Sequence, residues 1–305
     1  MRAYRVRMMF HPTIHVRSLD EAEDFYARVF GRPSTNISAI FPPSADHASD
    51  YSTFTSVADV LLDDLEPKRY VTNGEQRYPD VDAGHLRTTG WYVDGAAELY
   101  AELARQGIRV TDSRDRVLTE PEPPKGGQPF HTHPEDAGIR YHVFESFPFP
   151  LDPRTEEGWT LPPVSDADPL GIELCSHHTI LTTQPERALR LAVDVLGGEV
   201  VHTGHDELRG ASGPYVRLAD ALFHYATPEA GSAAEADAAT TGVDTYHAIT
   251  FKVADLERVE RHLEAEGVRI QSRSDTTLVT DPATSLGVPW GFTTELIPGD
   301  PRSVA

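Results

Sequence analysis

Hydrophobic and polar positions along the chain form segments that repeat. Residues 11–32 (HPTIHVRSLDEAEDFYARVFGR) align without a gap on residues 177–198 (HHTILTTQPERALRLAVDVLGG). In each segment, a short alternating run precedes a stretch whose apolar residues recur every three or four positions. Gly31 and Gly197 follow these stretches. The pattern predicts a strand and then a helix that ends at a glycine.

A second pair of segments repeats in the same way. Residues 90–110 align on residues 250–270, and each reads as strand, helix, glycine and strand. Two strand ends also correspond: residues 59–67 match 220–228, and residues 137–146 match 290–299. The chain is therefore predicted to contain two similar halves, each made of two related units.

The length and the proline distribution indicate two domains. A chain of 305 residues exceeds the usual single-domain size. Residues 148–171 are rich in proline, which suits an extended linker. We predict an N-terminal domain over 1–147, a linker over 148–171 and a C-terminal domain over 172–305.

Composition narrows the functional classes. Hydrophobic residues make up 39% and charged residues 25%, values typical of a globular protein. The single cysteine excludes an internal disulfide framework and a multi-cysteine zinc site. A net charge of -21 argues against nucleic acid and anionic membranes as partners. We expect a cytoplasmic protein with a small-molecule substrate, possibly a homodimer.

The opening segment FHPTIHVRSLDEAEDFYARVFG resembles the vicinal oxygen chelate superfamily, which includes glyoxalases, bleomycin resistance proteins and extradiol dioxygenases. The family pattern has a ligand histidine at the start of the first strand and a helix carrying a Phe-Tyr pair before a glycine. Residues 90–110 and 250–270 resemble the opening of the family's second unit. The resemblance implies an α+β fold of four βαβββ modules, paired into two half-open mixed β-barrels with helices outside.

The resemblance also implies metal ligands on the first and last strand of each unit. Their positions in this chain would be His11, Asp63 and His142 in one barrel, and His177, His224 and Glu295 in the other. Two further family positions hold Thr88 and Ala248, which are not strong ligands. If the first unit instead pairs with the fourth, the sets become His11, Asp63, Glu295 and His142, His177, His224. The sequence leaves both groupings open.

Two other histidines are candidate catalytic bases. Alternation places His15 on the same face as His11 and Thr13. His247 precedes Ala248, and only a β-bulge would turn its side chain inward. Without a bulge, alternation places His247 with Ile249 and Phe251 on the packed face.

Two histidines and one carboxylate are typical of a mononuclear non-heme iron site, although Zn, Mn, Co or Ni would also suit them. The favoured function is therefore a metal-dependent, ring-cleaving dioxygenase of the extradiol type that uses Fe(II) and acts on a small oxygenated, possibly phenolic, molecule. One alternative is a non-redox isomerase, epimerase or lyase of the glyoxalase type. The other is a metal-free protein that binds or sequesters a drug-like ligand.

Overall fold

Two mixed sheets of eight strands form the framework of the molecule. The computed structural model describes residues 2–42, 50–112, 116–120, 122–123 and 128–304. The first sheet has the order β2 (Ser34–Asn36), β3 (Ser52–Val57), β4 (Val60–Leu65), β1 (Arg5–His15), β7 (His85–Asp94), β10 (Arg140–Glu145), β9 (Phe130–Thr132), β8 (Val110–Thr111). The second has the order β12 (Glu199–Asp206), β13 (Ala211–Leu218), β14 (Ala221–Pro228), β11 (Ile172–Leu181), β15 (Thr245–Val253), β18 (Gly291–Thr293), β17 (Thr277–Thr280), β16 (Ile270–Arg273).

The two sheets have the same connectivity, which confirms the predicted fold of paired βαβββ modules. In the first, β1 lies between β4, with which it is parallel, and β7, with which it is antiparallel. In the second, β11 has the same relation to β14 and β15. The first unit therefore pairs with the second and the third with the fourth, so the alternative grouping of ligands does not form. A separate small hairpin joins β5 (Val71–Thr72) to β6 (Glu75–Gln76).

Helices follow the first strand of each unit, as the apolar spacing predicted. They are α1 (Leu19–Phe25), α2 (Ala96–Arg105), α4 (Pro185–Leu189) and α6 (Leu256–Ala265), with the short α3 (Pro134–Ala137) and α5 (Ala233–Ala238) between strands. Helices α1 and α4 continue as wider π-helical turns, over Tyr26–Phe30 and Arg190–Val195. Gly31 and Gly197 follow with φ of 64° and 88°, the left-handed conformation that favours glycine at a helix end.

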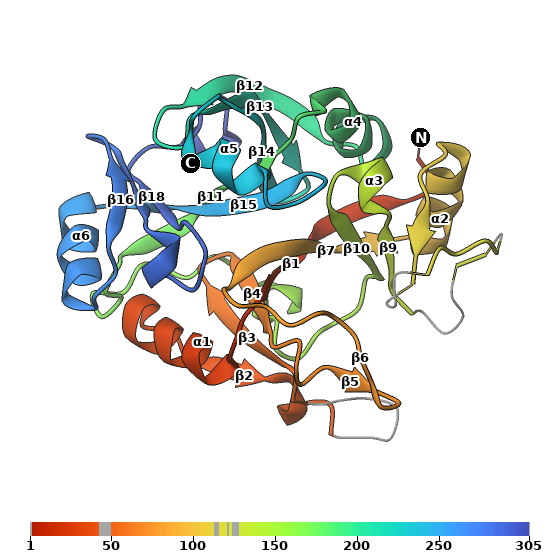
Figure 1. Cartoon of the computed structure of the whole chain (residues 1–305), viewed down its shortest axis with the longest axis horizontal. Coiled ribbons are helices and arrows are strands. Elements are labelled where there is room, and N and C mark those ends of the chain that lie inside the picture. The colour runs from red at the N-terminus through yellow and green to blue at the C-terminus, as the bar shows by residue number, and fades with distance from the viewer. Residues whose placement is uncertain (1, 43–49, 113–115, 121, 124–127, 305) are drawn as a thin grey trace.

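The two sheets pack back to back (Figure 1). Trp91 of β7 contacts Phe223 of β14 with ring centroids 5.6 Å apart, and the Tyr141 and Tyr225 hydroxyl groups hydrogen-bond at 2.8 Å. Phe30 also packs on Trp290 in the opposite half, at 5.2 Å. Because side chains alternate along a strand, the two concave faces point away from each other. One large hydrophobic cluster extends across both halves, and two smaller clusters lie within single halves.

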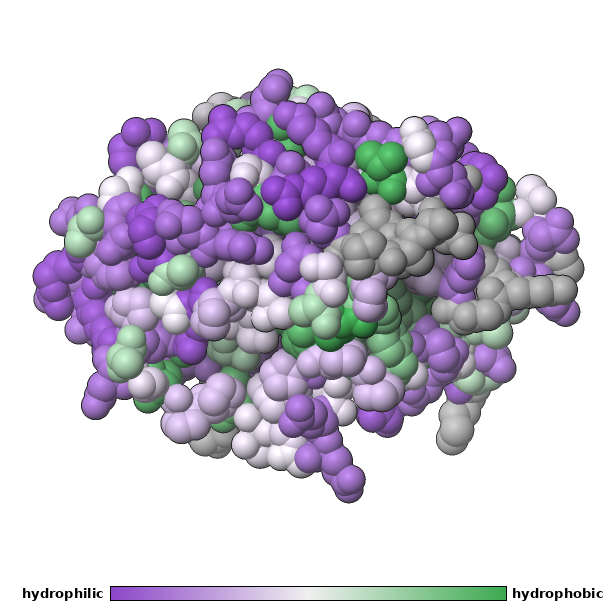
Figure 2. Space-filling view, turned by 90° about the horizontal axis from the view of Figure 1, so that it is seen from below, coloured by the Kyte–Doolittle hydropathy of each residue, from purple (hydrophilic) through white to green (hydrophobic). Residues whose placement is uncertain are grey.

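The face in Figure 2 is largely hydrophilic, with a smaller hydrophobic area near its centre. Among the helices that the structure describes, none has the length and apolar character needed to cross a membrane.

Candidate functional site

The concave face of the N-terminal sheet holds His11, Asp63 and His142. Asp63 lies beside Thr13 in the pairing of β4 with β1, and His142 lies beside Gly90 in the pairing of β10 with β7. A Cβ atom on Gly90 would lie only 3.1 Å from the His11 ring, so the glycine makes room for this imidazole. The structure therefore brings the three predicted ligands of this barrel to one face.

Asp63 and His11 belong to a buried hydrogen-bond relay. The Asp63 carboxylate accepts hydrogen bonds from the Ser52 hydroxyl and, at 3.1 Å, from the Thr13 hydroxyl. Because Thr13 has one proton and gives it to Asp63, His11 Nδ1, 3.1 Å from the same hydroxyl, is the donor of that bond. Burial raises the pKa of Asp63 to about 6 and lowers the pKa of His11 to about 3. His11 is therefore neutral near pH 7.

Aromatic rings surround this relay. His131 stacks on His142 with centroids 3.9 Å apart, and the Phe144 ring is tilted against His142 with centroids 4.0 Å apart. Phe54 approaches His11 at 5.9 Å. Burial, followed by the neighbouring His131 and His11, holds the pKa of His142 well below its ordinary value.

The C-terminal barrel has a different set of groups. His177 of β11 and His224 of β14 have ring centroids 6.4 Å apart, and Tyr215 stacks on His224 at 4.0 Å. His177 Nδ1 contacts the Ser176 hydroxyl at 3.1 Å, while its Nε2 atom has no partner in the described part of the chain. Burial, and then the charge of Arg209, holds the pKa of His177 well below its ordinary value.

Glu295 is not brought to His177 and His224. In the second sheet Gly291 lies opposite Thr250, as His142 lies opposite Gly90 in the first. Gly291 is therefore the structural equivalent of His142. The sequence match of residues 137–146 to 290–299, which made Glu295 the equivalent, differs from the strand register of the structure. Glu295 follows the end of β18 and is exposed.

The residues present do not fit a three-ligand metal site. Across residues 2–42, 50–112, 116–120, 122–123 and 128–304, no group of three or more His, Cys, Asp or Glu side chains is arranged to hold an ion. In the first barrel Asp63 is engaged by two hydroxyl groups, and in the second the predicted carboxylate lies outside. Thr88 and Ala248 add no ligand.

The two candidate bases meet in a cavity between the halves. This cavity has a volume of about 550 Å³, and its walls include His15, His85, Arg87, Arg140, Asp237 and His247. His247 reaches it through a β-bulge: Thr179 pairs with Ala248 but Ile180 pairs with Tyr246, which leaves His247 unpaired. The bulge thus directs His247 to the interface between the halves and not into the C-terminal barrel.

Charged groups are concentrated around this cavity. His247 Nδ1 lies 2.5 Å from the Asp237 carboxylate of α5. His15 is buried, with its ring 4.8 Å from Tyr78 and 5.9 Å from His85. Burial is the main reason that the pKa of His15 is well below its ordinary value, and the positive charges of Arg87 and Arg140 contribute. The cavity thus combines two cations with a histidine–carboxylate pair.

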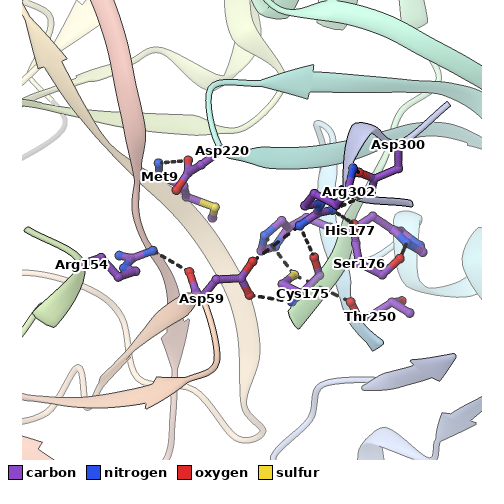
Figure 3. A network of polar contacts seen from close by, with 11 residues as sticks. Met9, Asp59, Arg154, Cys175, Ser176, His177, Asp220, Thr250, Asp300 and Arg302 are labelled. Atoms are coloured by element: carbon purple, nitrogen blue, oxygen red, sulfur yellow. Dashed lines mark hydrogen bonds and ion pairs between the residues drawn. The ribbon is translucent and has the colours of Figure 1, made fainter. Parts of the chain in front are cut away.

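A network at the other side of the interface positions the first strands (Figure 3). Asp59 accepts a hydrogen bond from the Cys175 amide at 2.6 Å, and Asp220 accepts one from the Met9 amide at 2.7 Å. These aspartates are equivalent in the repeat, so each half holds the first strand of the other.

Two arginines extend this network to the residues before His11 and His177. Arg154 donates to the Phe10 carbonyl at 2.5 Å, and Arg302 donates to the Ser176 carbonyl at 3.0 Å. Each guanidinium is also held by the aspartate two residues earlier, Asp152 or Asp300. No hydrophobic pattern indicated these groups, although Asp-Pro-Arg occurs at 152–154 and again at 300–302.

Comparisons with known proteins support the fold. No protein-family model matches the sequence, and no curated protein resembles it in sequence. The Mn(II)-bound glyoxalase from Novosphingobium aromaticivorans is similar in structure (TM-score 0.57, 15% identity, covering 97% of this chain and 85% of that one). So is the 2,3-dioxygenase LapB from Pseudomonas sp. KL28 (TM-score 0.58, 15% identity, covering 98% and 95%).

A triple mutant of 4-hydroxymandelate synthase from Streptomyces coelicolor has a TM-score of 0.62 at 12% identity and covers 98% of both chains. These similarities span nearly the whole chain. The protein shares the fold of these structures, and this is the four-module fold that the resemblance to the vicinal oxygen chelate superfamily implied.

Proposed function

We propose that this protein is a non-redox enzyme that moves a proton on a small, anionic, oxygenated molecule bound between its two halves. The observation that carries this proposal is the His247–Asp237 pair, with an Nδ1–Oδ2 distance of 2.5 Å, at the wall of a cavity that also contains Arg87 and Arg140.

The pair is arranged as a general base with an orienting carboxylate. Asp237 accepts the proton of His247 Nδ1, which fixes the tautomer and leaves the lone pair on Nε2. Nε2 then takes a proton from a carbon next to a substrate carbonyl, and the electron pair of that C–H bond moves onto the carbonyl oxygen. The imidazolium returns the proton to the same carbon or to a neighbouring one, so the reaction is an epimerisation or isomerisation.

The two arginines supply the complementary charge. Guanidinium groups bind carboxylates and stabilise negative charge that develops on oxygen. Both positive charges act on His15, and burial and these charges hold its pKa below the ordinary value. The wall also contains the carboxylates of Asp237 and Asp244, so the two arginines balance negative charge in the cavity. A cavity of about 550 Å³ is large enough for a small ligand.

A metal-dependent enzyme is the first alternative to this proposal, because similar structures include metal enzymes. A Mn(II)-bound glyoxalase and a 2,3-dioxygenase share this fold, which favours an enzyme acting on a small molecule. A ring-cleaving dioxygenase would need a metal with open coordination positions. Because the described donor residues do not form such a set, we assign no step of the reaction to a metal. A protein that only binds its ligand is the second candidate, since the cavity requires no ion.

Hydrogen exchange tests the proposal. The protein is incubated in D₂O with a panel of 2-oxo and 2-hydroxy carboxylates, and loss of the substrate C–H signal is followed by proton NMR. We expect exchange with at least one compound, a reduction of about 10²-fold or more in H247Q, and a smaller reduction in D237N. H205Q is the matched control, because His205 is exposed and also lies near a carboxylate, that of Glu229 at 3.2 Å.

The possible outcomes separate the candidates. Equal exchange in H247Q and the wild type would exclude His247 as the base. Saturable binding without exchange would favour the binding protein. Exchange or oxygen uptake that is lost on chelation and restored by a divalent ion would favour the metal enzyme.

A further inference from the structure

Arg209 is a buried cation inside the C-terminal barrel. It lies in the turn between β12 and β13 and is 3% exposed. Its Nη1 atom donates to Asp206 at 2.8 Å, and its Nη2 atom lies 3.3 Å from the Thr250 hydroxyl on β15. The side chain therefore extends from the turn to the middle of the sheet.

The guanidinium is next to the two histidines of this barrel. Thr250 pairs with His177 in the register of β11 and β15, so the group that contacts Thr250 lies beside His177. Gly291 leaves space for it, because a Cβ at that position would lie 2.7 Å from Arg209 Nη2. Gly291 therefore occupies the position predicted for Glu295 and also leaves the space that the Arg209 side chain fills.

The groups around Arg209 are of the kinds that bind divalent metal ions, although they are not arranged around one point. With metal–nitrogen bonds of about 2.1 Å, two imidazoles on one ion have centroids about 5 Å apart at a tetrahedral angle and about 6.4 Å apart when they lie opposite each other. The centroids of His177 and His224 are 6.4 Å apart. Asp206 is the nearby carboxylate, and its partner is the guanidinium. Neither imidazole is blocked by a salt bridge within the described residues.

We propose that His177, His224 and Asp206 form a latent divalent-cation site in which the Arg209 guanidinium is the resident cation and excludes the metal. Arg209 holds Asp206 away from the imidazoles, which accounts for the lack of a three-ligand group in the described structure. The carboxylate of this site is Asp206, the last residue of β12, and not Glu295. The proposal concerns the C-terminal barrel and does not depend on the chemistry of the cavity between the halves.

Cobalt binding tests this inference. Full-length wild type, R209A, R209M and R209K are titrated with Co²⁺, and the bound ion is followed by calorimetry and by its visible d–d absorption. We expect R209A and R209M to bind one Co²⁺ more per chain than the wild type. R209K keeps the positive charge and should bind no additional Co²⁺. R217M is the matched control, because Arg217 lies on β13 but forms an exposed ion pair with Glu199.

The ligands are assigned with second substitutions. The additional Co²⁺ should be lost in R209M/H177A and in R209M/D206N, but retained in R209M/E295Q. Thermal unfolding establishes that each variant is folded before titration. Folded R209M without an additional ion would overturn the inference. So would a Co²⁺ bound by the wild type and lost in H177A alone, because Arg209 would then not exclude the metal.

Discussion

At the scale of single residues, burial decides the charge of the groups in the barrels. His11 has a pKa of about 3 and is neutral near pH 7, whereas Asp63, with a pKa of about 6, is mostly ionised there at a cost in stability. The Ser52 and Thr13 hydroxyl groups offset part of that cost, since each donates to the carboxylate. Asp63 is therefore a residue whose replacement changes the pH dependence of stability.

We predict that D63N gains stability relative to the wild type as the pH rises. The folded protein holds the Asp63 proton more tightly than the unfolded chain, where the pKa is about 3.9. Ionising Asp63 thus lowers the free energy of unfolding of the wild type between about pH 4 and pH 6, and the loss is complete above that range. In urea unfolding, the unfolding free energy of D63N minus that of the wild type should increase by about 2 kcal/mol from pH 4 to pH 7.5. A difference independent of pH would contradict the raised pKa.

The sequence predicted the position of some candidate ligands but not of others. His11, Asp63 and His142 share a concave face because strand alternation and the repeat specify it. The position of Glu295 was predicted by matching residues 137–146 to 290–299, and a sequence match of this kind does not specify strand register. In the structure the pairing of β15 with β18 places Gly291 at the ligand position instead. Arg209 is in a turn, where no periodicity indicates the direction of a side chain.

At the scale of elements, the two Asp-Pro-Arg segments fix the strands that carry His11 and His177. Both β1 and β11 have irregular pairing near these histidines, with register shifts between Met9 and Pro12 and between Cys175 and His177. An irregular strand leaves carbonyl groups without ladder partners. Arg154 and Arg302 donate to carbonyl groups in these stretches.

We predict that R154M is strongly destabilising. The substitution leaves the buried Asp152 carboxylate without its cation and removes the bonds to the Phe10 and Asp59 carbonyls. Breaking a buried ion pair in this way costs about 3–5 kcal/mol. Urea unfolding at pH 7.5 measures it. R17M, which removes an exposed ion pair with Glu21, is the control and should keep the wild-type midpoint. Equal urea midpoints for R154M and R17M would show that the contacts of Arg154 do not contribute to stability.

At the scale of the whole molecule, the two halves form one body. The core is continuous across them, and Asp59 and Asp220 tie each half to the first strand of the other. The sequence predicted both halves from their repeated hydrophobic patterns. It did not predict the cavity between them, because that depends on how the sheets pack and on contacts such as Asp237 with His247 that no repeat encodes.

We predict a single unfolding transition for the full chain. Removing either half would expose a large part of the shared core, so neither half should persist when the other unfolds. Scanning calorimetry should give equal calorimetric and van't Hoff enthalpies. Two resolved transitions, or a calorimetric enthalpy about twice the van't Hoff value, would show that the halves unfold independently.

The bulges on β7 and β15 have a consequence for how the protein could have acquired its chemistry. Arg87 and His247 are the same position of the repeat; each is skipped in the pairing of its strand, and both line the one cavity. In a dimer of identical chains, symmetry would force both to be arginine or both histidine. Fusion of the two copies into one polypeptide removes that constraint. The cavity is therefore an asymmetric site, in which one repeat position contributes a guanidinium from the first half and an imidazole from the second.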